Sequence, residues 1–239
     1  MIYGKIIWSI FFDLKGAKIM FKNAKVALNY KVDGKVVAFS GNNEDLAVNY
    51  SFDGKSLKVT VKTNKETELY NLKVIADYNY PDDVRIMPNG YQSWSMTREY
   101  KKNEFYRGMN KLVKSIPLGF NMAGCSGDYM FREYPQKSGV FHGYTYSYIR
   151  TGNEFTLMGS LSEQEGYTIF NFDTNANTIV IEKDLECKVI NGEVTVLDMV
   201  VLTGEHDALF DEYFSLMGIE KPKTNRINGY TSWYNYYTD

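Results

Sequence analysis

The sequence predicts an all-β protein built from antiparallel strands. Short segments in which apolar and polar residues alternate recur along most of the chain, a period typical of strands with one buried face. Asp-Gly or Asn-Gly pairs separate several of these segments, and both dipeptides favour the tight turns of β-hairpins. The chain also contains 20 Tyr and 14 Phe residues, and aromatic side chains are enriched in strands.

The first third of the chain is predicted to form a meander. Its strands cover the alternating segments 24–32, 36–38, 57–61 and 72–76. Asp33-Gly34 and Asp53-Gly54 precede two of these segments, and we expect a hairpin turn at each pair. Pro81 follows the last segment and is expected to end the meander, because proline cannot donate to a strand ladder.

Strands are predicted again in the second half of the chain. They cover the segments 140–150, 154–161, 167–172, 178–183, 186–190 and 193–202. Asn191-Gly192 separates the last two, so we expect another hairpin turn there. Residues 81–135 show weak periodicity, and a long irregular segment inside a compact domain is often functional. The alternative is a surface excursion that covers a sheet edge.

One helix is predicted, from His206 to Met217. Its apolar residues form a single stripe at helical spacing: Leu209, Phe210, Tyr213, Phe214 and Met217. Gly218 suits the left-handed position after a helix, and Pro222 prevents continuation. We therefore expect the helix to close the β domain and residues 221–226 to be a linker.

Composition argues against several classes of function. A net charge of −2 gives no basic face for nucleic-acid binding, and no apolar run reaches the ~18 residues of a membrane span. Residues 6–12 are apolar, but Asp13 ends them without a small-residue cleavage site, so a buried strand is predicted instead of a signal peptide. With reduced thiols expected at Cys125 and Cys187, these features indicate a cytoplasmic protein.

The residues alone reveal no catalytic, metal or cofactor site. His142 and His206 are far apart, and neither lies in a metal-ligand motif. Cys125 is interpreted as a small buried or incidental thiol, although spacing does not exclude a Cys-His nucleophile pair. The acidic pairs are Asp82 with Asp83, Glu163 with Glu165, and Asp211 with Glu212. None has an evident reason to be desolvated, so we interpret them as solvated surface and not as the carboxyls of a glycosidase.

Two copies of one short motif stand out. Residues 89–94 read Asn-Gly-Tyr-Gln-Ser-Trp, residues 228–233 read Asn-Gly-Tyr-Thr-Ser-Trp, and five of the six positions agree. Asn-Gly favours a turn, so each copy is expected to deliver Tyr, Ser and Trp in extended backbone beside it. Such aromatic side chains suit a sugar or a protein partner. The alternative is that both copies are core aromatics that share a turn preference.

The ordered pair of motifs resembles the α-galactosidases of glycoside hydrolase family 36, the melibiases. The resemblance covers essentially the whole chain, but only the amino-terminal part of the family's enzyme. Residues 85–95 and 229–237 carry it, with weaker support from residues 159–163. It implies an antiparallel β-supersandwich of the galactose-mutarotase-like type over residues 1–203, a helix and linker over 204–226, and the first strand of a catalytic (β/α)8 barrel over 227–239. Family members retain configuration with two aspartates on later barrel strands. This chain is therefore expected to lack both aspartates and to be inactive alone.

The resemblance also implies which residues meet the substrate. Trp94 would form a wall of the galactose subsite, and Trp233 and Tyr234 would lie in its floor. Tyr91, also assigned to the substrate site, would hold the turn in place more than touch the sugar. Tyr230 stands where many relatives carry Trp, which keeps an aromatic side chain there.

These expectations leave three readings of function. In the first, the chain is the non-catalytic domain of an α-galactosidase-like enzyme that helps to form its pocket for an α-galactoside. In the second, it is a free-standing β-sandwich that binds a small carbohydrate. In the third, it is a structural module that forms homo-oligomers. No metal, cofactor, nucleic acid or membrane is expected to bind in any of them.

Overall fold

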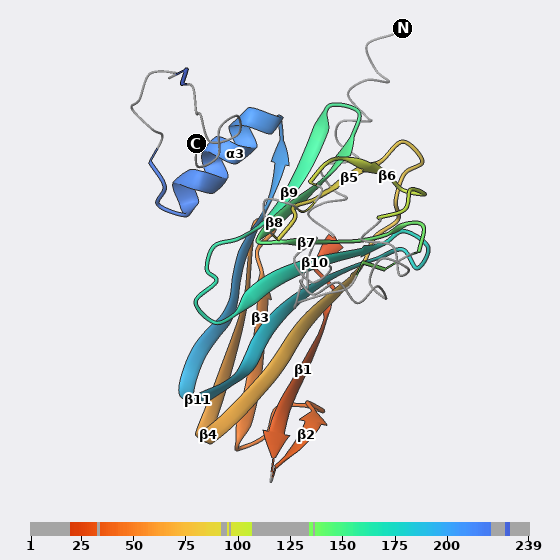
Figure 1. Cartoon of the computed structure of the whole chain (residues 1–239). Helices are drawn as coiled ribbons and strands as arrows, with labels where there is room; N and C mark the ends of the chain where they lie inside the picture. Colours follow the sequence, from red (N-terminus) through yellow and green to blue (C-terminus); the bar gives the residue numbers. More distant parts are fainter. Residues whose placement is uncertain are drawn as a thin grey trace, which may run out of the picture.

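The computed structural model describes residues 20–32, 34–91, 95, 97–106, 134–135, 137–220 and 228–229. Within these residues the all-β prediction is confirmed, because eleven strands form antiparallel sheet and one short helix packs beside them (Figure 1). The strand predicted at residues 6–12 lies outside the described residues. The division of the chain into three parts at residues 203 and 226 stays a prediction.

The strands, in chain order, are β1 (Lys25–Val32), β2 (Lys35–Ala38), β3 (Leu46–Phe52), β4 (Ser56–Asp77), β5 (Arg85–Pro88), β6 (Tyr100–Lys101), β7 (Val140–Tyr144), β8 (Tyr146–Thr151), β9 (Glu154–Ser160), β10 (Tyr167–Asp173) and β11 (Thr178–Gly204). The helix is α3 (His206–Leu216). The hairpin turns predicted before β2 and β4 are confirmed, and Gly34 and Gly54 both have positive φ, at 78° and 99°.

Two long strands, β4 and β11, hold the two parts of the sheet together. They pair from Asp77 opposite Thr178 to Ser56 opposite Val200. The other edge of β4 pairs first with β3 and then with β1. The other edge of β11 pairs first with β10 and then with β9. One wing of the sheet is therefore β2-β1-β4-β11-β10-β7, and the other is β3-β4-β11-β9-β8-β5-β6.

Both wings bury side chains in one large core. Its fully buried members include Leu28, Leu57, Leu72, Phe141, Phe170 and Ile181. A smaller core lies on the opposite face of β8, β9 and the end of β11, where α3 covers it. Alternation along β11 serves both cores, because Met199 and Val201 face the large one while Val200 and Leu202 face the small one.

The hairpin predicted at Asn191-Gly192 is wrong. β11 runs through both residues, and its pairing with β4 shifts register between Ile190 and Gly192, where Gly192 has a φ of 102°. Ile190 lies opposite Thr67 and Gly192 opposite Thr63, so the extra residues lie in β4 and the continuous antiparallel pair has a bulge there. The segments predicted as three strands are therefore one, and those predicted at 57–61 and 72–76 are both part of β4.

The single strand predicted over residues 140–150 is also wrong. The chain turns at Thr145, which has a φ of 63°, so β7 and β8 are separate strands. β7 pairs with β10 in one wing, whereas β8 pairs with β5 and β9 in the other. Thr145 is thus the corner where the chain crosses between the wings.

The predicted helix is confirmed as α3. The Glu205 side chain accepts from the backbone N–H groups of Asp207 and Ala208 and caps the N-terminus. Gly218 has the left-handed conformation expected after the last turn, with a φ of 72°. Of the predicted apolar stripe, Leu209 and Tyr213 are buried, while Phe214 is 39% exposed.

Tyr213 explains why β9 carries a glycine. A Cβ atom on Gly159 would lie 2.4 Å from the Tyr213 ring, so only glycine lets the ring pack this closely. The Tyr213 hydroxyl donates to the backbone oxygen of Ser160 at 2.7 Å. Burial of this hydroxyl raises its pKa above the ordinary value. The residues 159–160 thus fix α3 on the sheet.

Gly159→Ala should destabilise the protein by about 1 to 3 kcal/mol, because the added methyl group must displace the Tyr213 ring in a packed core. Urea unfolding followed by circular dichroism measures this loss. Gly229→Ala is the matched control, since no atom of the described residues lies within 4 Å of its added Cβ. Equal stabilities of the two variants would contradict the close packing of α3 on β9.

Candidate functional site

Of the four residues assigned to the substrate site, only Tyr91 is among the described residues. Trp94, Trp233 and Tyr234 lie outside the described residues, as do residues 92–93 of the first motif and 230–232 of the second. Tyr91 is described, together with Asn89 and Gly90. The candidate site is therefore built from the start of the first motif and from what surrounds Tyr91.

Asn89 fastens the motif to the corner between the two wings. The backbone N–H of Tyr144 donates to the backbone oxygen of Asn89 at 2.8 Å. In return, Nδ2 of Asn89 donates to the backbone oxygen of Tyr144 at 3.0 Å. Two hydrogen bonds in opposite directions fix both position and orientation, so Asn89 acts as the anchor of the turn.

Gly90 and Gly143 allow the chain segments to approach closely. The N–H of Gly90 donates to Oγ1 of Thr97 at 2.8 Å, and a Cβ on Gly90 would lie 2.3 Å from Cβ of Ser95. A Cβ on Gly143 would lie 2.7 Å from the backbone nitrogen of Asn89. A larger residue at position 143 would therefore push the motif away from β7, and one at position 90 would collide with Ser95.

Tyr91 packs edge-on against two other tyrosines. Its ring centroid lies 5.2 Å from that of Tyr144 and 5.7 Å from that of Tyr167, at interplanar angles of 61° and 79°. A hydrogen bond to Tyr167 raises the pKa of Tyr91. Edge-to-face contacts of this kind are favourable for aromatic rings. Further rings continue the cluster from Tyr144 through His142 to Tyr106 and Tyr134.

Thr145 holds Tyr144 in place from the other side. Its positive φ is unusual for a β-branched residue, so the surrounding bonds must impose it. The N–H of Thr145 donates to the backbone oxygen of Thr168 at 3.0 Å, and its own oxygen accepts from the N–H of Ser160 at 2.8 Å. The corner is thus tied to both β9 and β10.

A buried lysine, Lys183, supports the corner at Thr145 through its hydrogen bond to Thr168. Lys183 is 1% exposed, and its ammonium group donates to the backbone oxygen of Ser162 at 2.7 Å, Oγ1 of Thr168 at 3.0 Å and Oε2 of Glu163 at 3.1 Å. All three ammonium protons therefore have acceptors. Burial lowers the pKa of Lys183, and Glu163 opposes that effect. The network joins β9, β10 and β11.

The interpretation of Glu163 and Glu165 as solvated surface is wrong. Their side chains are only 28% and 19% exposed, because each pairs with a lysine of β11. The other acidic residues discussed above do form surface pairs: Asp82 contacts Lys102, and Glu212 contacts Lys55. The sequence did carry a signal for Lys183, which follows the buried Ile179 and Ile181 at the same spacing along β11.

The chain is fastened again after the motif, at Glu99. Arg150 donates two hydrogen bonds to this carboxylate, from Nε to Oε1 at 2.8 Å and from Nη2 to Oε2. The Tyr148 hydroxyl also donates to Oε1, at 3.1 Å. The hydrogen bond from Arg150 is the main cause that lowers the pKa of Glu99. The segment that carries Tyr91 is thus held at both ends, by Asn89 and by Glu99.

The described residues contain no group of three or more His, Cys, Asp and Glu side chains arranged to hold a metal ion. Cys187 is exposed and not in a disulfide, and Cys125 lies outside the described part. In the same part of the chain, no helix has the length and apolar character needed to cross a membrane.

Comparison with known proteins assigns no family. No protein-family model matches the chain, and no curated protein matches it.

Thr145→Asn should raise the free energy of unfolding by about 1 kcal/mol. Asparagine adopts the left-handed conformation with less strain than a β-branched residue, and every backbone hydrogen bond of the corner is kept. Urea unfolding measures the gain. Thr151→Asn on β8 is the control and should be neutral or destabilising, because strands favour threonine. A loss of stability at position 145 equal to that at 151 would show that the corner is not strained.

Glu99 should contribute stability that depends on pH. Its pKa is lowered from 4.5 in the folded protein, so its contribution is present above pH 4.5 and is lost as the pH falls through the folded value. Compared with wild type, Glu99→Gln should therefore be less stable at pH 7 and lose less stability on acidification. Unfolding free energies measured from pH 7 down to about pH 3 test this. If the unfolding free energies of wild type and Glu99→Gln fell equally with pH, Glu99 would make no pH-dependent contribution to stability.

Proposed function

We propose that this chain is the non-catalytic β domain of an α-galactosidase-like glycoside hydrolase, and that it helps to form the enzyme's galactose pocket. The pairing of β4 with β11 supports an antiparallel β-supersandwich of the galactose-mutarotase-like type, because two wings share these strands and enclose one core. The catalytic aspartates would belong to a barrel outside this chain.

The observation that carries the proposal is the double anchoring of the first motif. Asn89 exchanges two hydrogen bonds with Tyr144, and Tyr91 is held between Tyr144 and Tyr167. Trp94 follows three positions later in the sequence, so it departs from a fixed point. A side chain that forms a wall of a sugar subsite needs such a rigid base, because small displacements reduce catalysis.

The roles within the proposed pocket follow the resemblance stated above. Trp94 presents its flat face to the apolar side of the galactose ring, and Trp233 and Tyr234 contribute to the floor. Tyr91 positions the turn. The rigid packing of the Tyr91 ring against two neighbours is the observation that favours a supporting role for this residue.

A second candidate is a free-standing carbohydrate-binding module in the cytoplasm. The aromatic cluster around Tyr91, Tyr144 and Tyr167 favours it, because rings and hydroxyls together suit sugars. The two candidates differ in one respect. A free-standing module binds sugar by itself, whereas a pocket wall needs the barrel to complete the site.

In a protein that joins this chain to its catalytic barrel, Trp94→Ala should lower kcat/KM for a chromogenic α-galactoside about fivefold to tenfold, since an aromatic contact contributes about 1 kcal/mol. Phe105→Ala is the control, because Phe105 is 47% exposed and lies outside the motif. The chain alone should show no hydrolysis. Enzyme-like turnover by the chain alone, or unchanged kinetics of the Trp94 variant, would overturn the proposal.

A further inference from the structure

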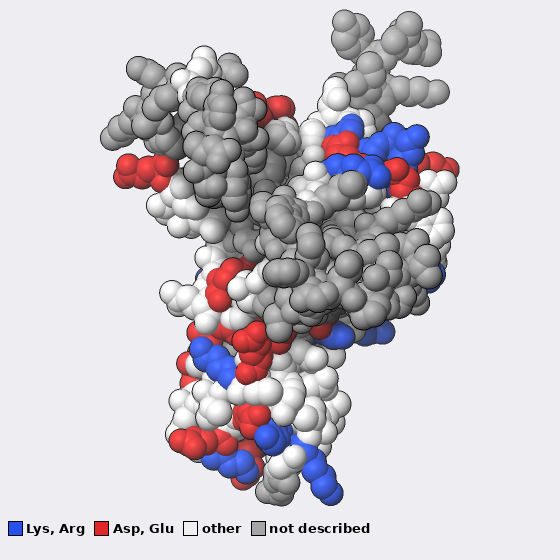
Figure 2. All heavy atoms as spheres, viewed as in Figure 1, with Lys and Arg blue, Asp and Glu red and all other residues white. Residues whose placement is uncertain are grey.

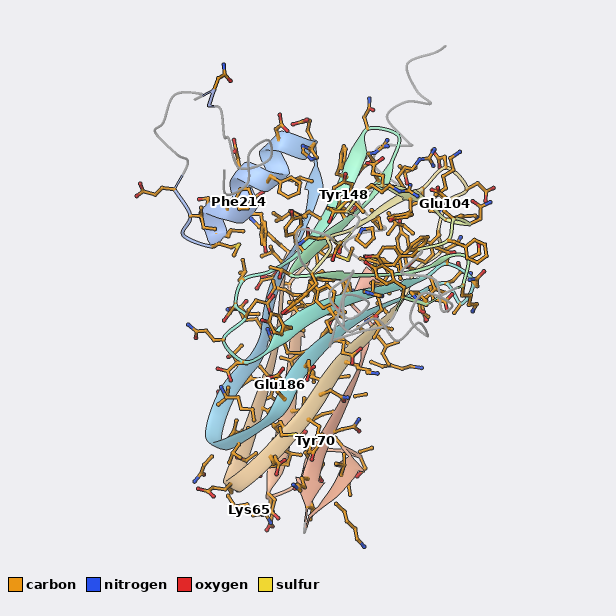
Figure 3. All side chains as sticks on the ribbon, in the orientation of Figure 1. Lys65, Tyr70, Glu104, Tyr148, Glu186 and Phe214 are labelled. Carbon is orange, nitrogen blue, oxygen red and sulfur yellow. The ribbon has the colours of Figure 1, made fainter. Side chains whose placement is uncertain are left out.

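A second candidate site lies at the other end of the molecule. β3 and β1 pair with the same edge of β4 in succession, and their pairing leaves a gap between Thr63 and Glu68. The gap forms a groove of about 680 Å³, which we call the β1–β3 groove; its lining includes Tyr30, Asn43, Glu44, Lys65, Glu66 and Thr67. Figure 3 shows Lys65 at the end of the sheets opposite Tyr148 and α3.

The lining is polar around a small apolar floor. Leu46 and Thr67 are buried at 2% and 7% exposure, and Tyr30 is half-buried and packs against the large core. Figure 2 shows acidic and basic side chains intermingled at this end of the molecule. The volume falls in the range of small-ligand sites, about 300–1,000 Å³.

Internal contacts already hold both lysines of the groove. Nζ of Lys65 lies 2.6 Å from Oδ2 of Asp45, and Nζ of Lys31 lies 3.0 Å from Oε2 of Glu68. The first pair links β4 to the segment just before β3, and the second links β1 to β4. Because each ammonium group has a carboxylate beside it, the groove offers no free cation to a phosphate or a carboxylate ligand.

Asn43 is held so that one half of its amide stays available. Its Oδ1 accepts from the N–H groups of Asp45 and Leu46, both at 2.9 Å. No described residue accepts from its Nδ2, which therefore leaves two donors. The carboxylates of Glu44 and Glu66 receive no hydrogen bond from any described side chain, and the lone pairs of Thr67 Oγ1 can also accept.

A half-buried ring, fixed amide donors and carboxylate acceptors around one cavity match the surface of a sugar. A sugar has apolar C–H faces, and each of its hydroxyl groups both donates and accepts. We propose that the β1–β3 groove binds a neutral carbohydrate, with Asn43 donating to a hydroxyl, Glu66 accepting from one, and Tyr30 contacting a ring face. This site is separate from the Tyr91 corner and does not depend on the proposed function.

Backbone-amide NMR of the whole chain tests this proposal directly. D-galactose, D-glucose, maltose and cellobiose are each titrated to about 100 mM, because a groove with few contacts gives millimolar affinity. At least one of them should shift the amide signals of Asn43, Lys65, Glu66 and Thr67 in a saturable way. Shifts confined to residues around Tyr91 would overturn this inference and would favour the free-standing carbohydrate-binding module instead. The absence of any shift would also overturn it.

Two isosteric variants separate binding from folding. Asn43→Asp keeps an oxygen for the N–H groups of Asp45 and Leu46 but removes the amide donors, and Glu66→Gln removes a carboxylate acceptor. Each should weaken the sugar affinity about fivefold to tenfold, the effect of one hydrogen bond. Glu220→Gln is the control and should leave the sugar affinity unchanged, because Glu220 follows α3 at the opposite end of the molecule from the groove. Equal affinities of all three variants would overturn the proposal, as would a groove that responds to trilysine but to no sugar.

Discussion

The antiparallel pair of β4 and β11 is the constraint on which the rest of the structure depends. On its outer edge, β4 pairs with β3 and then with β1, and β11 pairs with β10 and then with β9. The pair therefore sets the positions of the strands in both wings. The large core lies between the wings that the pair joins, and the small core lies under α3 at the end of β11. The β1–β3 groove arises from the same cause, since it is the place where β4 changes partner.

The corner at Thr145 is the second consequence of joining two wings. A chain that leaves one wing must turn sharply to enter the other, and here it does so with a left-handed β-branched residue. Hydrogen bonds of Thr145 with Thr168 and Ser160 hold that conformation, and Lys183 in turn donates to Thr168. Asn89 then uses the backbone of Tyr144, next to the corner, as its anchor. A buried charged network far from the motif in sequence is thus part of what positions the motif.

Local signals in the sequence predicted the fold class, most strands and the helix, because alternation, turn dipeptides and capping residues act over a few positions. Two similar turn dipeptides gave a correct hairpin prediction at Asp53-Gly54 and a wrong one at Asn191-Gly192. What differs is the partner strand: β4 continues past Gly192, which turns the kink into a bulge. Only the tertiary pairing decides between these outcomes, so the sequence alone could not.

The sequence likewise predicted only part of the candidate site, namely the residues of the repeated motif. Asn89 and Tyr91 stand out in the sequence because their motif recurs, whereas their supports are scattered over four strands and have no motif of their own. Tyr144 looked like one aromatic among several in a strand, and Thr145 looked like a strand residue. Lys183 was recognisable only by its spacing from buried isoleucines. Residues that act through long-range contacts become visible only once the topology is known.

Native-state hydrogen exchange measured by NMR tests the central claim most directly, namely that the first motif is held as rigidly as the sheet itself. The amide of Tyr144 is bonded to Asn89, and Ile181 lies in β11 where that strand is flanked by β4 and β10. The account predicts that both exchange only through global unfolding, with equal free energies of opening. Rapid exchange at Tyr144 while Ile181 stays protected would show that the motif opens independently, and the rigid base proposed for Trp94 would be lost.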